Sequence, residues 1–172
     1  MWWSPKTYEG KTTDDGFVLG LAWSEIQLYC PFVVFRPTVL PSNFMLEVIS
    51  FRPEVPPEPL PETEAGEETL PEMEANTSVR MLTKSDGGEL SIKQFLYDWL
   101  PPAYDHPSLW RSDRRPIPHE VGGAIGWVAS NFRGQHAGSI LLDRTMIEIT
   151  DIGGTLSDSE IVDVMNGLEP VG

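Results

Sequence analysis

The chain has 172 residues, the usual size of one domain, and its 40% share of hydrophobic residues excludes a disordered protein. Its formal net charge of −14 repels phosphate backbones and anionic lipid head groups, so nucleic acid is not expected as a partner. The sequence holds no apolar run long enough to cross a bilayer, so we expect no insertion into a membrane.

The first residues, Met1-Trp2-Trp3-Ser4-Pro5-Lys6, lack the charged and apolar regions of a signal peptide. We therefore expect a cytoplasmic protein by default. A periplasmic or extracellular protein whose export signal had been removed would look the same. Cys30 is the only cysteine, so no internal disulfide bond can form, and beside Phe32 we interpret it as a small buried hydrophobic residue.

Residues 53–78 differ from the rest of the chain in composition. Between residues 53 and 79 there are eight glutamates, six prolines and no Lys or Arg. Proline removes backbone donors and favours extended conformers, so this composition predicts a solvated, acidic insertion loop. Each flanking half has too few apolar segments to close a core alone, so we expect the insertion to join two halves of one sheet in a single domain, residues 1–172.

Apolar patterns predict strands in the first half. Runs at 17–21 and 26–35 are apolar, and residues 33–35 predict a strand that ends at Arg36-Pro37. Residues 44–51 then alternate, which predicts a second strand after a turn. One of its faces would carry Phe44, Leu46, Val48 and Ser50, and the other Met45, Glu47, Ile49 and Phe51.

The second half begins with an expected hairpin. Residues 79–83 form an apolar strand pattern, and Ser85-Asp86-Gly87-Gly88 supplies the residues that a tight turn needs. A returning strand over 89–96 follows from this turn. A helix over 89–100 is the alternative, because apolar residues there also fit helical spacing with Ser91 as N-cap; we favour the strand.

Five prolines between 101 and 120 predict an irregular, packed loop. Three strands are expected after it, at 124–130, 139–142 and 145–150, with Asp143-Arg144 as a two-residue turn. The glycines of Gly122-Gly123-Ala124-Ile125-Gly126 precede a strand and not a helix, so they indicate a bend or bulge and not a phosphate loop.

A short amphipathic helix is expected near the C-terminus. Ser157 or Asp158 caps it, and it carries an apolar stripe formed by Ile161, Val164, Met165 and Leu168. The predicted fold is thus α+β: one domain with a mainly antiparallel sheet of six or seven strands, this helix packed on one sheet face, and the acidic insertion.

Two stretches of the chain resemble a known family. Residues 31–44 read Pro-Phe-Val-Val-Phe-Arg-Pro-Thr-Val-Leu-Pro-Ser-Asn-Phe, and residues 156–168 read Leu-Ser-Asp-Ser-Glu-Ile-Val-Asp-Val-Met-Asn-Gly-Leu. They resemble the opening strand and the closing helix of a bacterial domain of unknown function related to periplasmic anti-sigma regulators and lipoprotein-sorting proteins. The resemblance implies a paired strand, an irregular insertion, further strands and a closing helix. It also implies a periplasmic, sigma-regulatory role, although members usually follow an export signal or membrane anchor and this sequence shows neither.

The sequence predicts no catalytic residue, no metal site and no cofactor. His106, His119 and His136 are the only histidines, and their spacing matches no common metal motif. Asp105-His106 is interpreted as a turn whose carboxylate bonds nearby amides.

The residues expected to bind a partner are few. Trp110, Arg111, Arg114 and Arg115 concentrate positive charge beside an aromatic residue, and these arginines would meet either an acidic partner or the chain's own glutamates. Trp2 and Trp3 at the chain start and His119 complete the set. We therefore predict a non-enzymatic binding or accessory protein with a protein partner. The alternatives are a subunit of a larger assembly, or a small hydrolase or transferase that pairs His119 or His136 with a carboxylate.

Overall fold

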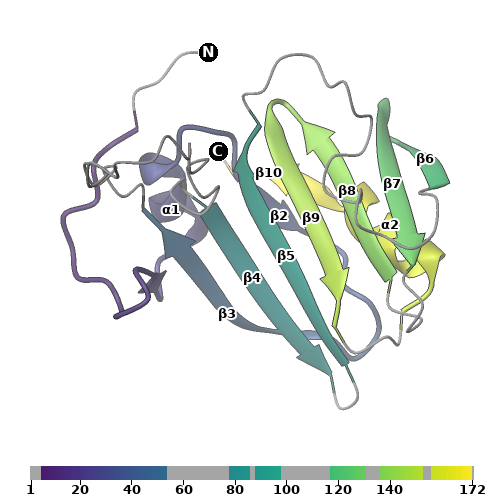
Figure 1. Cartoon of the computed structure of the whole chain (residues 1–172), viewed down its shortest axis with the longest axis horizontal. Coiled ribbons are helices and arrows are strands. Elements are labelled where there is room, and N and C mark those ends of the chain that lie inside the picture. Colours follow the sequence, from purple (N-terminus) through teal and green to yellow (C-terminus); the bar gives the residue numbers. More distant parts are fainter. Residues whose placement is uncertain are drawn as a thin grey trace, which may run out of the picture.

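An eight-stranded antiparallel sheet organises the chain (Figure 1). The computed structural model describes residues 5–53, 78–85, 88–97, 117–130, 136–152 and 156–171. Within these ranges the strand order is β1-β3-β4-β5-β9-β8-β7-β6. The strands are β1 (Val18–Leu19), β3 (Met45–Arg52), β4 (Ser78–Ser85), β5 (Gly88–Leu96), β6 (Ile117–Val121), β7 (Ala124–Ser130), β8 (His136–Leu142) and β9 (Thr145–Asp151).

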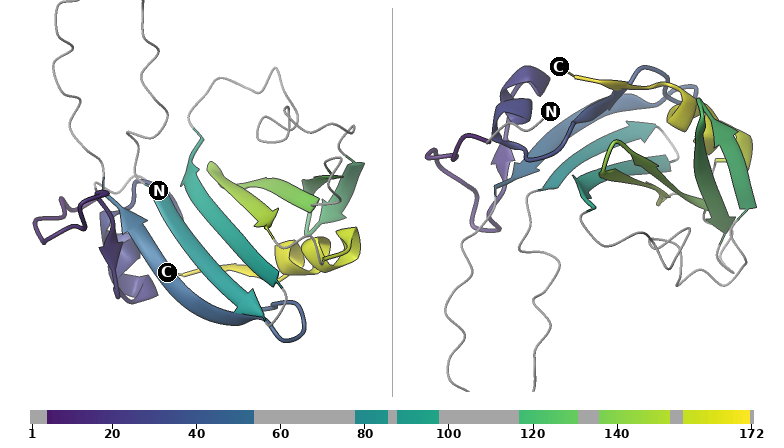
Figure 2. Two further views of the ribbon diagram at one scale, coloured as in Figure 1. Left: turned by 60° about the horizontal axis from the view of Figure 1, so that its bottom comes forward. Right: turned by 90° about the horizontal axis from the view of Figure 1, so that it is seen from above.

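Two helices and a two-stranded ribbon lie on one side of this sheet (Figure 2). They are α1 (Trp23–Tyr29), α2 (Asp158–Asn166), and the ribbon of β2 (Phe35–Pro37) with β10 (Leu168–Pro170). We call the side that they cover the inner face and the opposite side the outer face. The α+β class, the mainly antiparallel sheet and the C-terminal helix are confirmed, whereas residues 54–77 lie outside the described residues. The expected six or seven strands are too few, because the short edge strands β1 and β6 extend the sheet.

Side chains of the inner face form the core in two neighbouring clusters. One lies beneath α2 and contains buried residues of most strands: Phe35, Met81, Leu90, Ile92, Val121, Val128, Ile140, Ile147, Ile149, Leu156, Ile161, Val164 and Met165. The other lies beneath α1 and contains Val18, Ile26, Cys30, Phe32, Val34, Phe51 and Val79. The period of two along each strand places every second residue in these clusters.

Helix α1 begins before the apolar run 26–35 and overlaps its first residues, for which no helix is predicted from the sequence. The Ala22 N–H donates to Glu25 Oε2 at 2.9 Å, which satisfies one of the free donors at the helix start. Ile26 and Cys30 are four residues apart, and both are buried in the cluster beneath α1. The helix is only seven residues long, so its periodicity is hidden within the longer apolar run.

Side-chain amides hold the segment between α1 and β2. Gln27 donates through Nε2 to the Phe32 carbonyl at 2.9 Å and accepts at Oε1 from the Val34 N–H at 2.8 Å. Gln94 on β5 accepts at Oε1 from the Phe35 N–H at 2.8 Å and donates to the Phe35 carbonyl at 2.6 Å. Strand β2 begins at Phe35, later than the predicted strand over 33–35, and includes Pro37. Before it, the side chain of Gln27 satisfies the Phe32 carbonyl and the Val34 N–H.

The tight hairpins are confirmed. Ser85 pairs with Gly88, so β4 and β5 are joined by two residues, and the strand over 89–96 is correct where a helix was the alternative. Asp143 and Arg144 have φ of 45° and 67°, the left-handed pair that a two-residue hairpin turn requires. Residues 86–87 and 98–100 lie outside the described residues.

The glycine bend is a third hairpin, and the strand before it was not expected. Gly122 and Gly123 have φ of 54° and 87° and turn β6 back onto β7. The prediction of irregular structure throughout 101–120 is therefore wrong for β6. Pro118 is tolerated there because β6 is an edge strand, which leaves one side of its backbone free of ladder hydrogen bonds.

The predicted faces of β3 are also wrong at one end. A bulge shifts the register between Leu46 and Val48, so that Leu46 pairs with Thr83 and Val48 pairs with Leu82. Leu46 therefore shares the inner face with Ile49, and not the outer face with Val48. A strict period of two cannot reveal such an insertion of one residue.

Helix α2 packs closely on the sheet. Ser157 is its N-cap, and Ile161, Val164 and Met165 are buried as predicted, whereas Leu168 belongs to β10 and not to the helix. A Cβ added at Gly138 would lie 2.5 Å from Met165 Cε and 2.7 Å from Ile161 Cγ2, so the absence of a side chain on β8 permits this approach.

Candidate functional site

The outer face carries a row of apolar side chains across four strands, which we call the apolar row. Leu141 of β8 lies opposite Met146 of β9, and Met146 lies opposite Phe95 of β5. The register of β7 against β8 extends the row to Ile125. Met146 is 3% exposed, whereas Leu141 is 37% and Ile125 57% exposed, so the row is open to solvent at its β7–β8 end.

A second row of outer-face residues, the polar row, runs parallel to the first. Trp127 lies opposite Ser139, Ser139 opposite Glu148, Glu148 opposite Lys93, and Lys93 opposite Arg80. The row thus combines an aromatic ring at its β7 end with two cations at its β4 end. Directly opposite residues on one face lie within about 5 Å at their Cβ atoms, so these side chains are neighbours.

Glu148 is the carboxylate of the polar row. Burial raises its pKa above the ordinary value, and the positive charges of Lys93 and Arg80 oppose that rise. Glu148 is one carboxyl group beside two cations, so positive groups outnumber negative ones at the β4–β5 end of the polar row.

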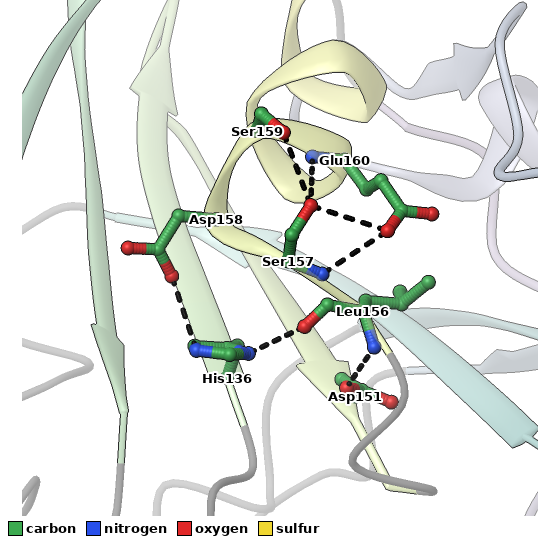
Figure 3. Close-up of polar contacts among 7 residues, drawn as sticks. All are labelled: His136, Asp151, Leu156, Ser157, Asp158, Ser159 and Glu160. Atoms are coloured by element: carbon green, nitrogen blue, oxygen red, sulfur yellow. Dashed lines mark hydrogen bonds and ion pairs between the residues drawn. The ribbon is translucent and has the colours of Figure 1, made fainter.

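A separate group of polar contacts surrounds His136 at the start of α2 (Figure 3). His136 Nδ1 lies 2.5 Å from the Leu156 carbonyl oxygen, and Nε2 lies 3.3 Å from Asp158 Oδ1. The Leu156 N–H donates to Asp151 Oδ2 at 3.0 Å, and Asp151 is fully buried at the end of β9. The segment that precedes α2 is thus bonded to β8 through His136 and to β9 through Asp151.

The capping box completes this group. Ser157 Oγ accepts from the Glu160 N–H at 3.3 Å, and the Ser157 N–H donates to Glu160 Oε1 at 3.2 Å. These two bonds satisfy backbone donors at the helix start. Ser157 is therefore used as a cap and lies in the ordinary geometry of a helix N-terminus.

The His136 group has the composition of a hydrolytic site but not its geometry. In a serine triad a carboxylate holds one imidazole nitrogen while the other faces the nucleophile and takes its proton. Here both nitrogens face acceptors, the Leu156 carbonyl and the Asp158 carboxylate. Neither nitrogen is directed at a hydroxyl or thiol nucleophile in this arrangement. His136 instead connects the start of α2 to the sheet.

Of the residues predicted to bind a partner, the structure places only His119. Trp2, Trp3, Trp110, Arg111, Arg114 and Arg115 lie outside the described residues, so their role stays a prediction. His119 lies on β6 opposite Gly126. Its Nε2 is enclosed and has no hydrogen-bond partner among the described residues. His119 and His136 lie on β6 and β8 with β7 between them, so the two histidines do not form one site.

The sequence does not predict the outer-face rows, although two hairpin turns determine part of their arrangement. A two-residue turn that pairs Ser85 with Gly88 also places Arg80 opposite Lys93, and the Asp143-Arg144 turn places Ser139 opposite Glu148. The pairing of β5 with β9, which brings Lys93 to Glu148, joins segments far apart in sequence. No local pattern indicates that contact.

The remaining candidate groups of the described residues offer no further chemistry, and Asp105-His106 lies outside those residues. Cys30 is fully buried, as expected, and burial strongly raises the pKa of its thiol. Within the described ranges, no three His, Cys, Asp or Glu side chains are placed to hold a metal ion. Helices long and apolar enough to span a membrane are likewise absent from the part of the chain that the structure describes.

Comparison of the chain with models of known families and with curated proteins finds no match. The resemblance to a bacterial domain of unknown function related to periplasmic anti-sigma regulators and lipoprotein-sorting proteins therefore stays a prediction from the sequence.

Proposed function

We propose that the protein is a non-enzymatic binding or accessory protein that holds another protein on the outer face of its sheet. The observation that carries this proposal is the open end of the apolar row. Leu141 and Ile125 are neighbouring aliphatic residues at 37% and 57% exposure, and Trp127 lies on the same strand and face as Ile125. Adjoining exposed apolar groups next to an aromatic residue are typical of a protein contact surface.

The arrangement of the layers also favours the outer face as the contact surface. Among the described residues, both helices and the β2–β10 ribbon pack on the inner face, so none of these elements covers the apolar row (Figure 2). The net charge of −14 makes a protein a better partner than nucleic acid. Enzymatic function gains no support from His136, because both of its nitrogens face acceptors.

The test is a substitution at the open end of the apolar row. Ile125→Asp places a charge where a partner would bury an aliphatic side chain, so recovery of a cross-linked partner from source cells should fall about tenfold or more. Asn166→Asp is the matched control, because it adds the same charge at an exposed position of α2. Quantitative mass spectrometry of the captured proteins measures both. Equal recovery from the wild type, Ile125→Asp and Asn166→Asp would overturn the proposal.

A further inference from the structure

The β4–β5 end of the polar row holds two positive charges directly opposite each other, Arg80 and Lys93, which we call the cationic pair. Both residues point to the outer face, because their neighbours Val79, Met81 and Ile92 are buried in the inner clusters. Arg80 is exposed, and Lys93 is partly buried with its Nζ 5.7 Å from the centre of the Phe95 ring.

Like charges at directly opposite positions of a sheet destabilise it. Within the described residues, neither Arg80 nor Lys93 makes an ion pair with a carboxylate. Both charges act on Glu148, but from beyond ion-pair distance. Glu148, which lies opposite Lys93, supplies at most one negative charge against the two positive charges of the pair. The cationic pair is therefore a site of unbalanced positive charge on a chain whose net charge is −14.

We propose that the cationic pair binds carboxylates of an acidic segment in the partner protein that the outer face holds. This inference rests on the proposed function and names the chemistry of its partner. An acidic segment relieves the repulsion between Arg80 and Lys93, and the guanidinium of Arg80 supplies the fork geometry that a carboxylate matches.

The neighbouring apolar row determines what else this segment contains. Phe95 lies two residues from Lys93 on the same face, and the open end of the apolar row at Leu141 lies two strands from β5, about 10 Å away. A partner that covers both sites presents acidic and aliphatic side chains together. The chain's own residues 54–77 are the competing source of carboxylates, since they are tethered between Arg52 and Ser78, paired residues beside the cationic pair.

The test uses a labelled peptide of repeating Glu-Glu-Leu and the full-length protein. We expect Arg80→Glu and Lys93→Glu each to weaken peptide binding about tenfold or more, and added salt to weaken wild-type binding. Arg36→Glu is the matched control, because Arg36 is an exposed cation on β2, and it should bind the peptide like the wild type. Thermal melting of each variant confirms that it is folded.

Two results would overturn the inference. The first is equal loss of peptide binding in Arg80→Glu and Arg36→Glu, which would indicate general attraction and not a site. The second is peptide binding that appears only after the eight glutamates between 53 and 79 are changed to glutamine, which would mean that the chain's own carboxylates occupy the pair. Partner capture separates the two proposals: loss in Ile125→Asp without loss in Arg80→Glu would leave the outer face as the contact surface and remove its acidic specificity.

Discussion

The inner and outer faces of the sheet are built from the same strands but differ in what lies against them. On β8, Ile140 is 1% exposed beneath α2, whereas its neighbour Leu141 on the outer face is 37% exposed. Within the described residues, the inner face is covered by α1, α2 and the β2–β10 ribbon. The outer face is exposed at Ile125, Leu141 and Arg80, whereas Met146 and Ser139 between them are buried. Substitutions should therefore lower the free energy of unfolding on the inner face and partner affinity on the outer face.

The largest effect is expected from a charged side chain in the helix that covers the inner face. Val164 of α2 is fully buried, and Val164→Asp would enclose a carboxylate without a partner, which costs more than a typical domain can tolerate. We expect loss of cooperative thermal unfolding, measured by circular dichroism. Asp163→Asn, at the exposed neighbouring position, should melt like the wild type. A soluble Val164→Asp protein with normal melting would mean that α2 does not form the core.

A smaller loss of stability is expected where the side chain of Gln94 bonds the backbone of β2. Gln94→Leu removes both hydrogen bonds to the Phe35 backbone and leaves a buried N–H and carbonyl unsatisfied. The free energy of unfolding should fall by about 2–4 kcal/mol in chemical denaturation. Amide exchange at Phe35 should accelerate more than exchange in β7. Unchanged protection of Phe35 would show that the ribbon is held by other contacts.

Close packing of α2 on β8 gives the next effect in size. Gly138→Ala would place a methyl group 2.5 Å from Met165 Cε, so the helix or the Met165 side chain must shift. We expect a loss of about 1–3 kcal/mol of unfolding free energy. Ala137→Val adds volume one residue away on the outer face and should cost less. Equal costs at the two positions would contradict the difference between the faces.

The smallest effect concerns Glu148 and depends on pH. Its pKa in the folded protein is raised above 4.5 mainly by burial, so between those two values the folded state binds more protons than the unfolded state. Wild-type stability should therefore decline as the pH rises through that window, and Glu148→Gln should lack this decline. Denaturation of both proteins across the window measures the difference. Parallel stability profiles would mean that burial of Glu148 is not penalised.

The features that could be predicted from the sequence are those determined by neighbouring residues. The turns at Asp143-Arg144 and Gly122-Gly123 need left-handed backbone, and the capping Ser157 satisfies a helix start, so local chemistry reveals them. Helix α1 was missed because its seven residues overlap a longer apolar run that hides their periodicity. Strand β6 was missed because a proline argues against a strand except at the edge of a sheet, where Pro118 lies. The bulge in β3 reverses the predicted face of Leu46, because an alternating pattern does not show how a strand pairs with its neighbour.

The candidate site was predictable only in fragments. Hairpin turns place Arg80 opposite Lys93 and Ser139 opposite Glu148, but the pairing of β5 with β9 that joins these fragments into one row is long-range. The exposure of Leu141 likewise depends on which face α2 covers. This pairing and this exposure depend on packing between distant segments, which periodicity and turn residues do not predict.

The most direct test of the difference between the faces compares aspartate at two adjacent residues of β8. Ile140→Asp and Leu141→Asp introduce the same group into the same strand, one on each face. Thermal melting and partner capture should be measured on both proteins. We predict that Ile140→Asp loses cooperative unfolding, whereas Leu141→Asp melts within a few degrees of the wild type and no longer captures its partner. A Leu141→Asp protein that melts far below the wild type, or that captures the partner as well as the wild type does, would contradict the account.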